Sequence, residues 1–173
     1  VYTHLRSCDV QPENLITIMG PSKTESLSGF RLGVAFGTPK LIERMESLQA
    51  IVSLCAAGYN QSVLDTWFQE PLGWIENRIR EHESIRDELL QTFRSGNIYT
   101  ATPQAGSYLF PQLPPLRVDL HTFIHLLRYQ AKVIVTPGSE FDPACMDSIR
   151  LNFSQDYSAA VSAAKRIVKM VEI

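Results

Sequence analysis

The sequence predicts an α/β fold, in which short apolar strands alternate with amphipathic helices. Brief apolar runs that end at Gly or Pro recur along the chain, and the segments between them repeat apolar residues every three to four positions. The chain has 173 residues, of which 45% are hydrophobic and 20% charged. This composition is typical of a globular protein that buries a core without disulfides.

Charge and cysteine usage exclude several classes of protein. A formal net charge of −2 provides no basic surface for nucleic acid. The uncharged stretches 47–64 and 95–116 contain polar residues or helix-breaking prolines, so we expect no membrane-spanning segment and no membrane partner. The three cysteines are widely spaced, which predicts reduced thiols in a cytoplasmic protein.

The first part of the chain predicts two strands and a helix. Apolar, partly β-branched residues at 15–19 predict a buried strand, and residues 31–36 predict a second strand. Thr38 and Pro39 are typical of the first residues of a helix. Apolar residues at helical spacing follow, and we expect Gly58 to stop this run.

A longer helix is predicted over 71–94, with an apolar stripe on one side, charges on the other and Gly96 beyond its end. Residues 98–110 predict two short strands, because a proline and a glycine interrupt the apolar pattern. We place a domain boundary in this region. Residues 1–72 are expected to belong to one domain, and residues 73–173 to a second, small one.

The remaining elements continue the alternation. Asp119 is expected to cap a helix, and residues 133–135 and 149–153 predict strands. A final helix is predicted from its apolar residues, which share one face between positions 160 and 171.

A polar segment follows the first strand and places Lys23 just beyond its end. A lysine amine that is partly desolvated can act as a nucleophile and form a Schiff base. Arg31 has a planar fork suited to a phosphate, and Ser22 provides a hydroxyl beside the lysine. Composition alone favours a polar turn with solvated side chains, because lysines are mostly exposed.

Residues 20–33 read GPSKTESLSGFRLG, which resembles the pyridoxal-phosphate (PLP) attachment site of class I/II aminotransferases of fold-type I architecture. That pattern has a small residue, the cofactor lysine and a Gly-x-Arg-hydrophobic-Gly ending. The resemblance implies that Lys23 forms a Schiff base with PLP and that Arg31 binds its phosphate. Gly20 departs from the pattern, since many relatives have Ser there, so that phosphate contact is either absent or supplied by Ser22.

Downstream segments extend the resemblance over nearly the whole chain. Residues 135–141 followed by 148–153 resemble the small-domain signature of the family, and residues 103–110 resemble its strand beside the substrate cleft. Arg150 alternates with apolar neighbours on a predicted strand, so it points away from the core and its fork can bind a carboxylate. An ion pair on a sheet surface is the alternative. The resemblance implies that Arg150 binds the α-carboxylate of the substrate.

The resemblance also carries expectations about the whole protein. It implies an α-amino acid and a 2-oxo acid as substrates, and a homodimer in which the loop around Tyr59 approaches the active site of the partner subunit. Residues 1–72 would be the end of the large PLP-binding domain. The resemblance likewise implies that residues 73–173 are a linking helix and the small C-terminal domain.

The family's acidic partner of the pyridine nitrogen and its stacking aromatic residue lie upstream of the lysine, and the chain starts without Met, close to Lys23. We therefore expect the C-terminal portion of an aminotransferase, inactive by itself. A PLP-dependent lyase, decarboxylase or oxidase on the same scaffold is an alternative. A non-catalytic module that retains the fold is another.

His121 and His125 are four residues apart, so they share a helix face on which a metal could bind. No glutamate follows His121 and no third ligand is evident. We therefore predict no metal site.

Overall fold

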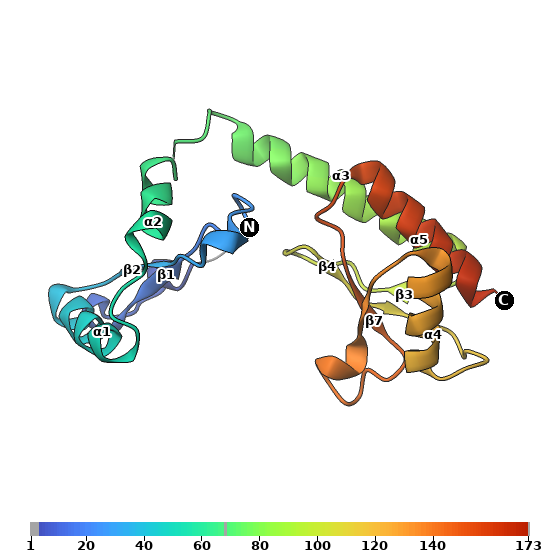
Figure 1. Cartoon of the computed structure of the whole chain (residues 1–173). Helices are drawn as coiled ribbons and strands as arrows, with labels where there is room; N and C mark the ends of the chain where they lie inside the picture. Colours follow the sequence, from blue (N-terminus) through green and yellow to red (C-terminus); the bar gives the residue numbers. More distant parts are fainter. Residues whose placement is uncertain (1–3, 68, 173) are drawn as a thin grey trace. The chain divides into compact units, whose positions relative to one another are not determined.

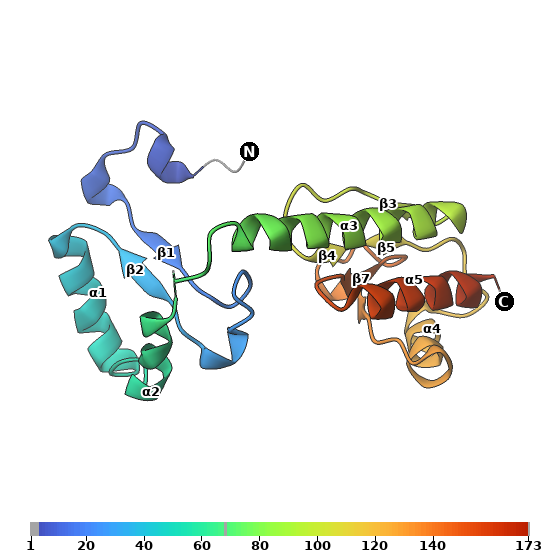
Figure 2. The same ribbon diagram turned by 90° about the horizontal axis from the view of Figure 1, so that it is seen from above.

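The computed structural model describes residues 4–67 and 69–172. The chain divides into two compact units, residues 1–75 and 76–173. Both units contain helices and short strands, which confirms the α/β class (Figures 1 and 2). No helix in the described ranges is long and apolar enough to cross a membrane.

The first unit is built around an antiparallel pair of strands, β1 (Thr17–Met19) and β2 (Val34–Phe36), which lie side by side (Figure 2). Helix α1 (Pro39–Val52) follows β2, and α2 (Gly58–Gln61) follows α1. Short 3-10 helices complete the unit at Leu5–Ser7, Pro12–Asn14, Ser28–Phe30 and Ser62–Asp65. The buried apolar side chains of the unit include Leu32, Val63 and Trp67.

Three expectations for this unit are wrong in detail. Strand β1 is not buried, because Ile18 is 70% exposed in a sheet that has only two strands. Strand β2 begins at Val34 and not at residue 31, because Arg31 has a left-handed backbone with φ of 49°. Helix α1 ends at Val52, well before Gly58, and Leu54 just beyond it is also left-handed.

The second unit contains most of helix α3 (Trp74–Ser95) and two small sheets. One sheet has the strand order β4-β7-β6, and the other pairs β3 with β5. The remaining elements of the unit are β3 (Tyr99–Thr100), β4 (Tyr108–Leu109), β5 (Pro111–Gln112), α4 (Leu120–Leu126), a π-helical turn (Leu127–Ala131), β6 (Thr136–Pro137), a 3-10 helix (Gly138–Glu140), β7 (Ile149–Asn152) and α5 (Tyr157–Val171).

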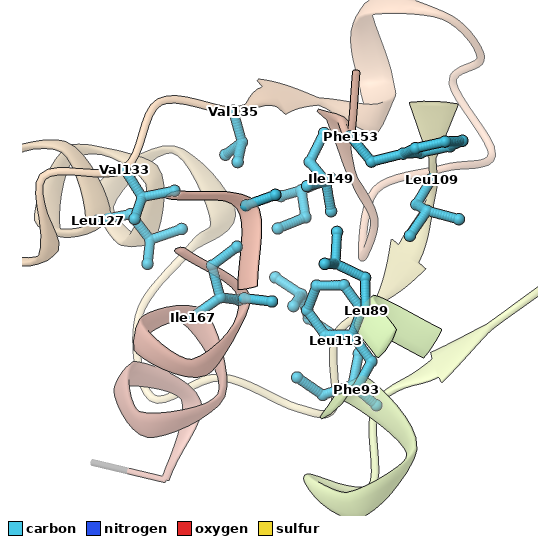
Figure 3. Close-up of a cluster of buried hydrophobic side chains, with 14 of the residues drawn as sticks. Leu89, Phe93, Leu109, Leu113, Leu127, Val133, Val135, Ile149, Phe153 and Ile167 are labelled. Atoms are coloured by element: carbon cyan, nitrogen blue, oxygen red, sulfur yellow. The ribbon is translucent and has the colours of Figure 1, made fainter. Parts of the chain in front are cut away.

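A single apolar core joins these elements. Figure 3 shows Leu89 and Phe93 of α3, Ile149 of β7 and Ile167 of α5 directed into the same space. All four side chains are fully buried. Truncating such a residue costs about 2–5 kcal/mol, so this core holds β7 firmly in place.

Helix α3 begins at Trp74 and ends at Ser95, not at the expected residues 71 and 94. Its apolar stripe is buried only in the C-terminal half, and Ile79 is 52% exposed. Gly96 follows the helix as expected, but Asn97 adopts the left-handed conformation, with φ of 55°. Gly96 is required for packing instead, because a Cβ there would lie 2.4 Å from Val168.

Two strand assignments also change. Val133 and Val135 are buried and Ile134 is exposed, as in a strand, but the pairing with β7 starts only at Thr136. Strand β5 was not predicted, because it contains Pro111, which lacks the N–H of a ladder donor.

Gly138 lies in a tight turn before β7, and its replacement by alanine is expected to destabilise the protein. An added Cβ would lie 2.6 Å from the carbonyl oxygen of Cys145 and 2.9 Å from that of Ser148. We expect Gly138→Ala to lower the free energy of unfolding by about 1–3 kcal/mol in urea denaturation. Gly58→Ala is the control, because its Cβ would meet nothing within 4 Å. Equal stability of the two variants would contradict the crowding.

Asp119 caps α4 as predicted. Its carboxylate accepts hydrogen bonds from the hydroxyl of Thr122 at 2.6 Å and from the backbone N–H of Thr122 at 3.0 Å. These bonds, the hydroxyl first, lower the pKa of Asp119. A lowered pKa means that the stabilisation is complete above the pKa of the unfolded state and is lost as pH falls through the folded value.

We therefore expect Asp119→Ala to lower the melting temperature near neutral pH, and the gap from the native protein to close in strong acid. Thermal unfolding across acidic pH measures this. Asp119→Asn keeps a capping oxygen that does not titrate, so its gap should be smaller at neutral pH. A gap for Asp119→Ala that does not change with pH would argue against the cap.

Candidate active site

A long connection, residues 20–33, joins the end of β1 to the start of its paired strand β2. Met19 pairs with Val34, so the first and last residues of the connection lie together. A Cβ on Gly20 would lie 3.2 Å from the carbonyl oxygen of Leu32, which shows how close the two ends run. The strands thus position a loop that carries both Lys23 and Arg31.

Backbone hydrogen bonds fold this loop back on itself around Lys23. Pro21 is fully buried, and its carbonyl accepts the N–H of Leu27 at 3.0 Å. The Lys23 carbonyl accepts the N–H of Ser26, whose left-handed φ of 60° makes the turn. The Lys23 side chain is exposed and forms no ion pair within the described part of the chain. Its amine is therefore accessible to a ligand.

Arg31 follows a 3-10 helix and is also exposed. Its Nη1 donates to the carbonyl of Ser28 at 3.0 Å, which ties the side chain to its own loop. No carboxylate among the described residues pairs with Arg31, so the rest of its fork is available for an anion.

The donor set of the loop fits PLP. An accessible amine suits the aldehyde carbon of the cofactor, and a guanidinium without a carboxylate partner suits its phosphate. Ser22, next to Lys23 and half-buried, adds a hydroxyl donor on the same loop. The individual roles of Lys23, Arg31 and Ser22 remain predictions.

Tyr59 lies beside this loop. Tyr59 was expected in a loop, but it lies in the first turn of helix α2 and is 78% exposed. Its ring stacks on Phe30, the residue before Arg31, with ring centroids 6.2 Å apart and an angle of 27°. Phe30 was not predicted, because no periodic pattern marks a single aromatic residue between Gly29 and Arg31.

Arg150 lies on β7, the central strand of the three-stranded sheet. Its neighbours Ile149 and Leu151 are buried in the core, whereas Arg150 is half-buried and opposite Thr136 of β6. This is the predicted alternation, which puts the guanidinium on the face away from the core.

Two aromatic rings contact the Arg150 guanidinium. Its Cζ lies over the ring of Tyr108, 4.4 Å from the centroid, and over that of Phe141 at 4.2 Å. Phe110 packs edge-on against Phe141, with centroids 5.6 Å apart. Arg150 forms no ion pair in the described ranges. These contacts were not predicted, although Tyr108 lies in the segment 103–110 and Phe141 in the segment 135–141, both of which resemble the family.

The described residues hold no group of three or more His, Cys, Asp or Glu that could bind a metal. His125 of the suggested pair stacks on Tyr129, with ring centroids 6.4 Å apart. The thiols of Cys8, Cys55 and Cys145 are all free.

Comparison with known proteins identifies the family to which the two α/β units belong. The model of the family "Aminotransferase class I and II" matches residues 3–167, so the chain belongs to that family. The fold is accordingly part of the fold-type I aminotransferase architecture.

Individual relatives agree with this. The crystal structure of an aspartate aminotransferase from Rhodobacter sphaeroides 2.4.1 is 62% identical, with a TM-score of 0.91 over 99% of this chain and 45% of that one. An aromatic aminotransferase from Pyrococcus horikoshii OT3 is 25% identical, with a TM-score of 0.84 over 99% of this chain and 47% of that one. The aromatic-amino-acid aminotransferase 2 of Thermococcus litoralis is 26% identical over 97% of this chain and 44% of its own. The chain thus spans less than half the length of these relatives.

Proposed function

We propose that this chain forms part of a PLP-dependent aminotransferase, which moves an amino group between an α-amino acid and a 2-oxo acid. One observation carries the proposal: the loop between β1 and β2 presents the accessible amine of Lys23 and the guanidinium of Arg31, neither paired with a carboxylate of the described chain. Membership of the aminotransferase family supports it.

In this proposal the loop holds the cofactor. When bound, PLP withdraws electrons from the substrate's Cα. Lys23 would bind the cofactor through its amine and would act as the general base that moves the proton at the substrate's Cα. Arg31 and Ser22 bind the phosphate. We assign Tyr59, on the adjacent helical turn, to substrate binding.

Arg150 binds the α-carboxylate of the substrate. Its fork offers two parallel N–H donors, which match the two oxygens of a carboxylate. Two aromatic rings contact it, and no carboxylate among the described residues pairs with it and competes for a ligand.

For the whole protein we propose the domain division of the family: residues 1–72 end the large PLP-binding domain, and residues 73–173 form the linking helix and the small domain.

We propose a cytoplasmic homodimer, with the present chain inactive by itself. Free cysteines support a reducing compartment. Exposed apolar side chains on the first unit, among them Ile51, Val52 and Leu54, support a surface that is covered in the full-length dimer.

The test is the requirement for an amino-group acceptor. The purified full-length protein with PLP is supplied with an amino acid, in the presence or absence of a 2-oxo acid, and products are quantified. Because the relative at 62% identity is named an aspartate aminotransferase, aspartate is the first donor to assay. We expect turnover only with the acceptor, with one new amino acid formed per donor consumed. Turnover without an acceptor would indicate a lyase, decarboxylase or oxidase, and no turnover with any donor would indicate a non-catalytic module.

A further inference from the structure

We propose that Tyr108 and Phe141 form an aromatic clamp that positions the guanidinium of Arg150 for the substrate carboxylate. The proposal rests on the proposed function, because it takes Arg150 as the carboxylate ligand. In this scheme Tyr108 and Phe141 are positioning residues and act through Arg150.

The register of the sheet places the first ring of the clamp, that of Tyr108, near Arg150. Tyr108 of β4 pairs with Asn152 of β7, and Leu109 pairs with Leu151. Side chains two residues apart on a strand share a face, so Arg150 and Asn152 lie on the same face as Tyr108. Tyr108 is thus the diagonal cross-strand neighbour of Arg150, which is within reach of a ring. Its distance of 4.4 Å from the Arg150 Cζ is that of a cation–π contact.

A short turn places the second ring of the clamp, that of Phe141. Phe141 follows the 3-10 helix Gly138–Glu140, and its N–H donates to the Gly138 carbonyl at 2.9 Å. The Gly138 N–H in turn donates to the carbonyl of Ser148, just before β7, at 2.7 Å. Phe110 braces the ring of Phe141 from its edge. The backbone around Gly138 therefore holds Phe141 against the strand that carries Arg150.

In this proposal the two rings stack on the guanidinium, which determines which part of it is available. Rings that lie against a guanidinium occupy its faces and leave the N–H groups in its plane. Those in-plane donors are the groups that bind a carboxylate with two parallel hydrogen bonds. An unrestrained arginine loses rotamer freedom when it binds, whereas a clamped one has lost it beforehand. The clamp should therefore strengthen substrate binding and leave the chemistry at Cα unchanged.

The experiment measures steady-state kinetics of the full-length holoenzyme. In Tyr108→Leu and in Phe141→Leu, we expect KM for the amino acid to rise about three- to thirtyfold and kcat to stay within about twofold. Tyr108→Phe and Phe141→Tyr restore an aromatic face and should recover most of the lost affinity. Tyr129→Leu is the matched control, because Tyr129 is an exposed aromatic residue of the same unit that stacks on His125.

Two comparisons separate this proposal from the function on which it rests. Arg150→Leu is assayed in parallel, and each variant is also tested with an alkyl amine that lacks the α-carboxylate. If Arg150→Leu weakens amino-acid binding but the leucine variants of the clamp do not, the clamp is wrong and the function stands. If Arg150→Leu has no effect, the carboxylate assignment fails and the clamp falls with it.

Equal losses with the amine and the amino acid would show a general structural role and overturn the clamp. Phe141 is 49% exposed, so its truncation is well tolerated by the fold. If Tyr108→Leu does not fold, Phe141→Leu and Phe141→Tyr decide the matter.

Discussion

Lys23→Ala in the full-length protein is expected to lower the rate of transamination by at least about a thousandfold. In the proposed function, the variant loses the amine that binds the cofactor and, in the same group, the base that moves the proton at Cα. Pro21 and Leu27 hold the loop through backbone contacts, so the fold should survive the substitution. Steady-state turnover with PLP and a 2-oxo acid acceptor measures the effect.

Two further variants separate chemistry from charge. Lys23→Arg keeps a cation but is not a nucleophile, so we expect it to be as inactive as the alanine variant. Lys40→Ala removes another exposed lysine, in the first turn of α1, and should leave turnover unchanged. Activity of Lys23→Ala near the native level would refute the assignment.

Arg150→Leu should lower kcat/KM for the amino acid by roughly a hundredfold or more. In the proposed function Arg150 donates two charge-assisted hydrogen bonds to the carboxylate. The variant loses both, and hydrogen bonds to charged groups contribute about 1.5–3 kcal/mol each. Ile149 and Leu151 keep β7 in the core, so the loss should appear in substrate affinity and not in stability.

Arg150→Lys provides the sharper comparison, because it keeps the charge and loses the fork. We expect it to fall between the native protein and Arg150→Leu. Arg128→Leu, at an exposed arginine on the π-helical turn of the same unit, should have no effect. If Arg150→Leu and Arg128→Leu have the same kinetics, Arg150 does not bind the carboxylate.

The capped helix α4 and the polar loop follow from local sequence, because their determinants lie within a few residues. Asp119 caps α4 through Thr122, three positions away, and the loop at Lys23 is marked by its own residue pattern. Strand ends depend on partners instead. Residues 133–135 have strand periodicity, but the ladder begins at Thr136, where β7 comes within reach.

The contacts around Lys23, Arg31 and Arg150 could not be predicted from local sequence. The left-handed backbones of Ser26 and Arg31 are unusual for residues other than glycine and leave no signal in the sequence. Tyr108 and Phe141 reach Arg150 only through the register of β4 on β7 and the turn at Gly138. Local patterns thus identify the charged groups, and tertiary pairing determines what holds them.

The most direct test of the account is the site at which the protein binds PLP. The full-length protein is loaded with PLP and reduced with borohydride, which makes the bond to a lysine permanent, and the labelled peptide is then identified by mass spectrometry. The account predicts a single label on Lys23. A label on any other lysine, or none at all, would contradict it.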